Sequence, residues 1–537
     1  MPLWGQKKPF HYEETFDQAP VSVSQKHRLT TPAYEYTGVG FSVRQVNIDG
    51  AGRNIVGDAA NEPSLVIDPM QPTRMAIGWR QFDTIASNFR QAGVAFSFDA
   101  GTVWRNQRPI EAGIFRSDPV LDADRAGNFY YNSLTNSAGT YSCHVFKSEA
   151  GGSAWGPRVF AWGGDKQWMA IDRTTTPTKG NIYAFWKSGI SSCPDKGFTR
   201  SLNGGATYEP CEVLPLSPER GTLVVSPTGS LYACGSNSNG FAVIKSEQPG
   251  APVFSWNNVQ QVDLGGNLAL YDGPNPTGML GQSWIDVDNS GTSSQGNVYL
   301  LSTVTDDTDP ANIMLARSTD GGGTWEPPVR INDDTENSNW QWFGSLSVAP
   351  TGRIDVTWFD TRDNPGTYLS RLYYSYSQDG GRTWSVNKAL SEAFDPHLGW
   401  PQQTKIGDYN HQRSDARGVH LAWAATFNGE QDVFYSYLVP DAPTATSEAP
   451  RPARLTVVPN PFSGSTRFYV NRQQPGHVEI SISDAMGNQI EILDAGHASS
   501  GVQTLEWQTS RPTGVYFYKV LHNQAVTAAG RLMCIKE

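Results

Sequence analysis

The chain has 537 residues, a formal net charge of −11 at pH 7, 53 glycines, 35 prolines and 17 tryptophans. The acidic balance argues against a nucleic-acid partner, which needs a basic face, and no apolar run approaches the roughly 18 residues of a membrane span. Many turn and aromatic residues without long apolar runs are typical of an all-β protein with short strands, and the length predicts one large and one small domain.

Two interleaved repeats organise residues 56–439. The first has the form S-x-D-x-G-x-T-W and occurs at 96–104, 200–208, 317–325 and 376–384, with decayed copies at 147–155 and 245–256. In each copy the Asp or Asn is expected to cap a tight turn through backbone amides, a Gly to take positive φ, and the Trp to pack under a neighbouring strand. The second repeat is a strand, a turn and a strand ending in an aromatic residue, and it begins at 63, 118, 168, 221, 283, 344 and 411.

The first repeat resembles the Asp box of sialidase-like β-propellers. The seven copies of the second repeat then predict seven blades of four strands, which is similar to the architecture of ulvan lyases. Residues 1–55 are expected to form an extended N-terminal segment, in which residues 38–48 supply a strand that closes the ring. The predicted fold class is all-β: a seven-bladed β-propeller followed by a small C-terminal immunoglobulin-like β-sandwich.

The tail has a different composition. Residues 440–453 are rich in Pro, Ala, Ser and Thr and predict a semi-rigid linker. Residues 454–537 contain short alternating strands, which indicate a β-sandwich. The pieces VVPNPF, ISISDAMGNQI and PTGVYFYKV resemble the C-terminal sorting domain of the type IX secretion system, and a generic immunoglobulin-like module is the alternative.

That second resemblance implies a Bacteroidetes-type source, the type IX secretion machinery as a partner, and a location outside the outer membrane, either secreted or on the cell surface. Four of the five cysteines fall between residues 143 and 234. One or two disulfides there would suit an exported protein, and buried free thiols are the alternative.

In a propeller, strands A to D of each blade run from the axis outward. The A–B and C–D turns lie on one face, here called the turn face. The B–C loops and the links to the next blade lie on the other, here called the exit face, where the resemblance places the active site. The residues expected on the exit face include Glu62, Arg80, Asp83, Arg90, Asp118, Asn132, Tyr141, His144, Trp168, Lys187, Arg200, Arg220, Trp284, Arg362, Asp408, Tyr409 and His411.

Several arginines on one face suit an acidic polysaccharide or glycan, because guanidinium forks bind carboxylate or sulfate, and exposed Trp rings suit the apolar faces of sugars. Salt bridges between blades are the alternative role for these arginines. The residues predicted to bind substrate are Arg80, Arg90, Arg200, Arg220, Arg362, Trp168 and Asn132.

Three functions are consistent with this face. A uronate polysaccharide lyase acting by β-elimination is favoured, with His144 and Tyr141 as catalytic residues. A sialidase-type hydrolase would use Tyr409 as nucleophile and Asp83 as acid/base, but the Arg-Ile-Pro motif of that family is replaced by Asn61-Glu62-Pro63. A propeller that only binds glycan or protein is the third possibility.

No cofactor is expected to be required and no metal ligand is assigned. A structural Ca²⁺ or Zn²⁺ ion is the alternative, and the acidic loop of Asp306, Asp307 and Asp309 is the candidate for Ca²⁺.

Overall fold

The computed structural model describes residues 18–20, 28–137, 139–440, 454–472, 476–484, 487–498, 501–522 and 525–536. The chain divides into two compact units, Met1–Ala442 and Pro443–Glu537, and each is described by itself. Among the described residues, no helix has the length and apolar character needed to cross a membrane.

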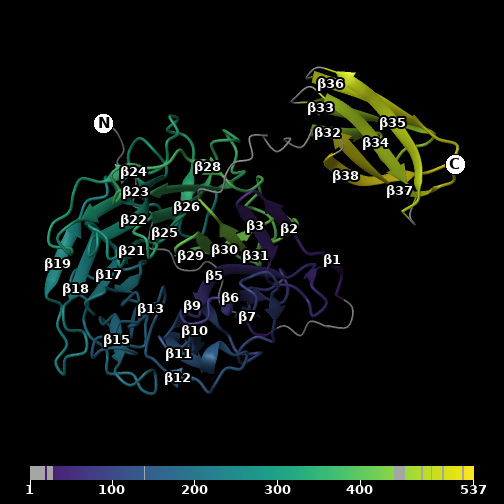
Figure 1. Cartoon of the computed structure of the whole chain (residues 1–537). Coiled ribbons are helices and arrows are strands. Elements are labelled where there is room, and N and C mark those ends of the chain that lie inside the picture. Colours follow the sequence, from purple (N-terminus) through teal and green to yellow (C-terminus); the bar gives the residue numbers. More distant parts are fainter. Residues whose placement is uncertain are drawn as a thin grey trace, which may run out of the picture. The chain divides into compact units, whose positions relative to one another are not determined.

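Seven antiparallel sheets follow one another in the first unit and surround a common centre (Figure 1). Blade 1 has β5 (Ala59–Ile67), β6 (Met75–Phe82), β7 (Gln91–Ser97) and β8 (Arg105–Asn106), and blade 2 has β9 (Ser117–Ala123), β10 (Phe129–Ser137), β11 (Thr140–Ser148) and β12 (Val159–Phe160). Blade 3 has β13 (Trp168–Ile171), β14 (Ile182–Phe185) and β15 (Phe198–Ser201). Blade 4 has β16 (Leu223–Val225), β17 (Leu231–Asn237), β18 (Gly240–Ser246) and β19 (Asn258–Val262). A short 3-10 turn, η2 (Glu149–Gly151), follows β11.

Blades 5 to 7 complete the ring. Blade 5 has β21 (Trp284–Val287), β22 (Val298–Thr305), β23 (Asn312–Ser318) and β24 (Val329–Arg330), and β20 (Asn267–Leu268) also pairs with β22. Blade 6 has β25 (Gln341–Val348), β26 (Ile354–Asp360), β27 (Arg371–Ser377) and β28 (Lys388–Ala389). Blade 7 has β29 (His411–Ser414), β30 (Val419–Ala425) and β31 (Asp432–Leu438). The seven-bladed fold predicted from the repeat count is confirmed.

The last blade takes its outer strands from the other end of the unit. β3 (Phe41–Gln45) pairs antiparallel with β31, and β2 (Glu35–Gly38) pairs with β3. Because these strands are more than 380 residues from β31, their backbone hydrogen bonds join the two ends of the ring. A separate ribbon of β1 (Thr30–Pro32) and β4 (Arg53–Ile55) lies outside this sheet.

The turns of the first repeat are built as the sequence predicts. The Oδ1 atoms of Asp99, Asn203, Asp320 and Asp379 each accept a hydrogen bond from the backbone amide four residues later, at 2.9–3.0 Å. Gly101, Gly205, Gly322 and Gly381 take positive φ there. These turns have a structural role, because each one connects two adjacent strands of a blade.

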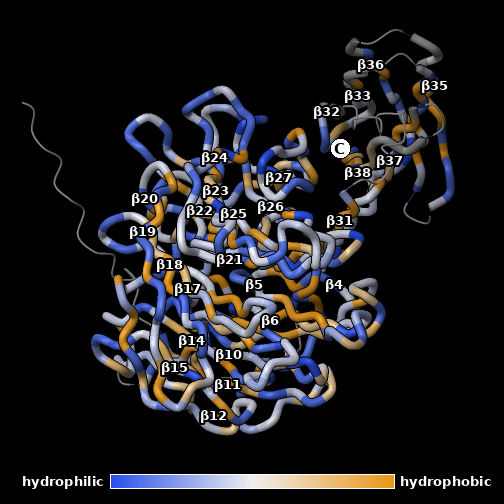
Figure 2. Tube along the Cα trace, turned by 60° about the vertical axis from the view of Figure 1, so that its left-hand side comes forward, coloured by the Kyte–Doolittle hydropathy of each residue, from blue (hydrophilic) through white to orange (hydrophobic). Residues whose placement is uncertain are grey.

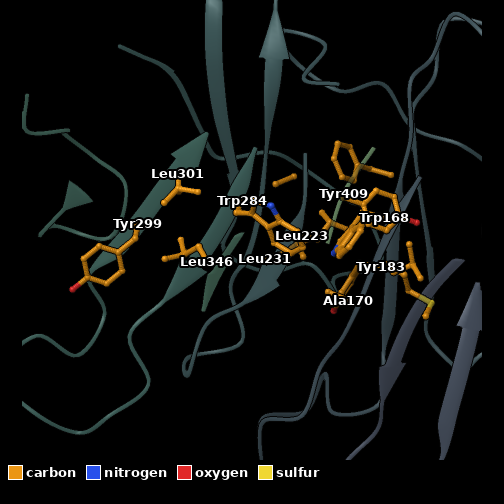
Figure 3. Packing of buried hydrophobic residues seen from close by; sticks show 14 of the residues in the cluster. Trp168, Ala170, Tyr183, Leu223, Leu231, Trp284, Tyr299, Leu301, Leu346 and Tyr409 are labelled. Carbon is orange, nitrogen blue, oxygen red and sulfur yellow. The ribbon is translucent and has the colours of Figure 1, made fainter. Parts of the chain in front are cut away.

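The core follows the strands, where apolar residues concentrate, while the loops are mostly hydrophilic (Figure 2). Around the axis, the rings of Trp168, Trp284 and Tyr409 pack edge to face, with Trp168 5.1 Å from Trp284 and 5.5 Å from Tyr409 between ring centroids (Figure 3). These residues come from the start of the inner strands of blades 3, 5 and 7. The aromatic rings therefore fill the middle of the axial channel.

One disulfide joins Cys193 to Cys211, with Cα atoms 6.5 Å apart. Cys143, Cys234 and Cys534 are free and buried. The prediction of at least one disulfide in this region is confirmed, and the bond links the B–C loop of blade 3 to the segment after β15.

The second unit is a sandwich of two antiparallel sheets. One has β32 (Arg454–Val458), β33 (Ser465–Arg472) and β36 (Gly501–Gln508); the other has β34 (Gly476–Ser483), β35 (Gln489–Ala498), β37 (Gly514–His522) and β38 (Ala525–Cys534). Its own core includes Phe468, Ile480 and Trp507. The predicted C-terminal sandwich is thus present.

Candidate active site

In every blade, one residue at or just before the exit-face end of the inner strand has a positive φ. Five of these residues are not glycine, and their φ values lie between 48° and 57°. A non-glycine residue in this conformation costs of order 1 kcal/mol or more, and such strain gathers at functional sites. The seven residues, from blade 1 to blade 7, are Glu62, Asp118, Lys166, Arg220, Gly281, Phe343 and Gly407.

In three blades this residue forms a β-bulge, visible as a register shift at Glu62, Asp118 and Phe343. A bulge re-aims the side chain that it carries. Four of the seven positions hold a charged residue. The sequence thus uses one repeated backbone distortion to place Glu62, Asp118, Lys166 and Arg220 around the exit-face end of the axis, here called the mouth.

Ion pairs across the mouth show that these side chains converge. Lys166 Nζ of blade 3 lies 2.5 Å from Asp408 Oδ2 at the start of blade 7. Lys405 Nζ lies 3.0 Å from the same oxygen and 3.9 Å from Glu62 Oε1 of blade 1. Arg80 Nε lies 3.2 Å from Glu62 Oε2. Since blades 3 and 7 are not neighbours, the network spans the opening.

The network separates the protonation states of its two best buried carboxyl groups. Burial raises the pKa of Glu62 to about 8, although Arg80 opposes the rise. Burial acts the same way on Asp408, but Lys166 and Lys405 outweigh it and hold the Asp408 pKa well below its usual range. At neutral pH, Glu62 is therefore mostly protonated and Asp408 is ionised. Because Glu62 is protonated, the mouth carries one negative charge less.

The accessible part of the mouth lies between blades 3, 4 and 5. Lys166 and Arg220 each expose 12% of their side chains, and Lys187 and Tyr271 are half-buried. Arg220 Nη1 lies 3.2 Å from Glu219 Oε2, and its Nε is buried without a hydrogen-bond partner. Within the described part of the chain, Lys187 has no carboxylate at salt-bridge distance. This region offers cations that the protein itself does not neutralise fully.

Two groups here have pKa values shifted in opposite senses. Burial lowers the pKa of Lys187, and the nearby Arg220 lowers it further. Burial raises the pKa of Tyr271, although Arg220 and Lys166 oppose that rise. Tyr271 also has a positive φ of 53°. The site therefore holds an amine with an increased tendency to lose its proton and a phenol with an increased tendency to keep it, and the charges of Arg220 and Lys166 act on both groups.

Most of the predicted substrate-binding arginines are not available to a substrate. Arg80 and Arg90 are 1% exposed and form part of the packing between strands. Arg200 is bound to Glu209 and to the carbonyl of Pro249 close to a turn of the first repeat.

Arg362 bonds Asp333 and Asp360, which ties blade 5 to blade 6. These four side chains serve the fold, because protein groups of their own or the adjacent blade bind them. Of the predicted arginines, only Arg220 is placed at the accessible mouth.

His144 and Tyr141 are not brought together. They are three residues apart on β11 and so face opposite sides of the strand. His144 Nδ1 lies 3.2 Å from Arg116 Nη1, and burial together with Arg116 lowers the His144 pKa to about 4. The prediction of a shared catalytic role for this pair is thus at odds with the geometry.

Tyr409 and Asp83 are also separated from an accessible reaction centre. Tyr409 is 4% exposed, and its hydroxyl donates a 2.9 Å hydrogen bond to the Pro119 carbonyl beneath the mouth. Asp83 accepts hydrogen bonds from Gln81 and Gln91 in its own blade. Tyr409 belongs to the aromatic core, because its ring packs on Trp168.

The remaining predicted residues are not exposed at the mouth. Asn132 is fully buried, and Trp168, Trp284 and His411 line the axis from the turn face rather than the exit face.

In the acidic loop, Asp306 Oδ1 caps the backbone amides of Thr308 and Asp309. Among the described residues, the one close group of potential metal ligands is His477, Glu479 and Asp494 in the second unit.

Sequence reasoning placed Lys187 on the exit face without giving it a role, and it missed Lys166, Lys405 and Tyr271. Lys166 lies five residues before the end of its inner strand, as Glu62 and Asp118 do in their blades. That offset is the signal that would have found it. Tyr271 lies in an irregular connection between β20 and β21, where no periodicity marks it.

No known family profile matches the chain. Over 81 residues it is 30% identical to a curated sialidase of Bacteroides fragilis (strain YCH46), and this segment spans 14% of that protein.

Among solved structures, it is similar to a protein of unknown function from Dyadobacter fermentans (TM-score 0.42, 13% identity, 74% of this chain and 99% of that one). It is also similar to an ulvan lyase bound to a glucuronate–rhamnose sulfate unit (TM-score 0.43, 12% identity, 74% and 96%) and to a Trypanosoma rangeli sialidase (TM-score 0.37, 10% identity, 93% and 89%). The chemistry of this chain is therefore argued from its own residues.

Proposed function

We propose that this propeller is a carbohydrate-active protein that cleaves a uronate-containing polysaccharide by β-elimination at the mouth. The observation that carries the proposal is the group of Lys187, Arg220 and Tyr271. It combines incompletely neutralised cations with an amine and a phenol whose pKa values are shifted in opposite senses. These are the elements that elimination from a uronate requires.

The first requirement is to neutralise the substrate carboxylate, because the proton on the adjacent C5 carbon is acidic only when that negative charge is balanced. Arg220 is suited to this role by its planar fork and by its buried, unpartnered Nε. Lys166 adds a second positive charge nearby, although Asp408 holds part of it.

The proton transfers can then be assigned. In its deprotonated form, Lys187 takes the C5 proton through Nζ, and the resulting negative charge is delocalised into the carboxylate held by Arg220. The electron pair forms the C4–C5 double bond as the C4–O bond breaks. Tyr271 donates its hydroxyl proton to the leaving oxygen. The lowered pKa of Lys187 favours a base, and the raised pKa of Tyr271 favours a group that is protonated before the reaction.

The test is to incubate the protein with ulvan and other uronate polymers and to follow the ultraviolet absorbance of the unsaturated product. Arg220→Gln, Lys187→Gln and Tyr271→Phe are each expected to lower kcat/KM by roughly 100-fold or more. Lys179→Gln is the matched control, because Lys179 is an exposed lysine on the turn face of the same blade as Lys187. Equal activity of Lys187→Gln and Lys179→Gln would contradict the assignment of the base.

The short match to a curated sialidase keeps one alternative, a sialidase-type hydrolase. A fluorogenic sialoside tests it in parallel. Release of the fluorophore without any unsaturated uronate product would replace the lyase by the hydrolase. If neither substrate yields a product and an acidic glycan still binds, the protein has a binding function alone.

We further propose that the second unit directs export by a type IX secretion system, which would place the protein outside the outer membrane. Support comes from the motifs at 457–462, 480–490 and 512–520 and from the separation of this unit from the propeller. Deletion of residues 443–537 is expected to abolish export while the propeller still folds. Export of the truncated chain at the normal level would contradict this role.

A further inference from the structure

The axis ends in a cavity on the turn face, away from the mouth. It has a volume of about 520 Å³ and is bounded by the A–B turns and inner strands of blades 2 to 7. Its inner end is formed by Trp168 and Trp284, whose rings pack against each other (Figure 3). The ring of His411 lies 5.4 Å from Trp168 and 5.6 Å from Trp284 between centroids. A cavity of this size has room for a small molecule.

Two arginines converge on one carboxylate in the wall of this cavity. Arg173 Nη2 lies 2.8 Å from Asp122 Oδ1, and Arg413 Nη2 lies 3.4 Å from the same atom. The side chains of Arg173 and Arg413 are 35% and 36% exposed, whereas Asp122 is 2% exposed. Two guanidinium groups with one shared counterion leave an excess of positive charge.

The other groups of the cavity offset this excess only in part, and many guanidinium donors stay unused. Among the described residues, each guanidinium donates a hydrogen bond to protein only at Asp122, although a guanidinium has five N–H donors. Asp286 also lines the cavity, where its oxygens accept the amides of Val287 and Val348 and its charge offsets one guanidinium. With Arg125 at the rim, the lining still has three guanidinium groups against two carboxylates.

Two further groups set the charge of the cavity. His411 is fully buried, and burial together with Arg413 lowers its pKa well below 6.5, so it is neutral at physiological pH. Arg125 lies exposed at the rim and adds one more cation. Burial lowers the pKa of Arg413, and Arg173 lowers it further while Asp122 opposes the change.

From the cavity, the converging guanidinium groups and their unused donors, we infer that the turn-face end of the axis binds a small oxyanion, the carboxylate or sulfate group of an acidic sugar. The unused N–H groups of Arg173 and Arg413 would donate to the anion, and its charge would relieve the repulsion between the two cations. The aromatic inner end and the volume leave room for one sugar ring beside the anionic group. This site is independent of the proposed elimination at the mouth.

Isothermal titration calorimetry at constant ionic strength tests the inference, with sodium sulfate, sodium glucuronate and neutral glucose as separate ligands. Sulfate, glucuronate or both are expected to bind, and glucose is not. Binding of sulfate alone would define a sulfate site, and binding of glucuronate alone a carboxylate site. Arg413→Gln is expected to weaken anion binding by roughly tenfold or more. Arg417→Gln is the matched control, because Arg417 is an exposed arginine in the same turn and does not line the cavity.

Two other variants make the result unambiguous. Thr175→Trp fills the cavity from an exposed position in its wall without changing charge, and it is expected to abolish binding even if Arg413→Gln is unstable. All titrations use the Arg220→Gln background, so that binding of glucuronate at the mouth does not contribute to the measured affinity. The inference fails if neither anion binds, if glucose binds as glucuronate does, or if Thr175→Trp binds normally.

Discussion

Replacing Glu62 by Gln tests the electrostatics of the mouth directly. The folded protein raises the Glu62 pKa from 4.5 to about 8 because the carboxyl is fully buried. A group whose pKa is raised on folding binds its proton more tightly in the folded state. Its contribution therefore lowers the free energy of unfolding as pH rises from about 4.5 to about 8. Each pKa unit corresponds to about 1.4 kcal/mol, so ionisation of Glu62 costs up to roughly 5 kcal/mol.

Gln resembles the protonated acid and cannot ionise. The E62Q variant is thus expected to match the wild type near pH 5 and to exceed its stability by a few kcal/mol at pH 8. Urea unfolding of both proteins across this range measures the difference, with Glu336→Gln as the control because Glu336 is exposed. Parallel pH profiles for wild type and E62Q would refute the idea that a protonated Glu62 is part of the mouth.

Three further changes separate structural from chemical roles. Tyr409→Phe is expected to lose about 1 kcal/mol of stability with its hydrogen bond to Pro119 and to retain turnover; loss of activity in a stable protein would restore Tyr409 as a catalytic residue. His144→Ala is expected to keep at least half of the wild-type kcat/KM, and a drop of 100-fold in the same assay would contradict this. Cys193→Ser opens a loop with a sequence separation of 18 and is expected to cost about 3 kcal/mol of stability in urea unfolding; an unchanged midpoint in oxidising buffer would argue against the disulfide.

The fold could be predicted because its information is local and repeated. Each turn of the first repeat needs its own Asp or Asn cap, and each inner strand needs its own apolar residues. Seven copies of one pattern therefore report seven blades. The closing strand was also visible, since residues 41–45 belong to no repeat of their own and pair with β31.

The site was less predictable, because burial of a charged side chain is decided by neighbours distant in sequence. Arg80 and Arg90 lie in blade 1, as the sequence predicts, but Glu62 and Ser117 hold their side chains inside the protein. Lys166 and Lys405 are joined at Asp408 although they lie 239 positions apart. No spacing in the sequence marks that meeting, which depends on the closure of the ring.

The most direct test of the central claim compares two substrates with the wild-type protein. One is a uronate polymer, and the other is the same polymer with its carboxylates reduced to alcohols. We expect the unsaturated product to form only from the first polymer, because Arg220 needs a carboxylate to bind and the C5 proton needs that carboxylate to become acidic. Failure to release unsaturated product from any uronate polymer, or equal cleavage of both polymers, would contradict it.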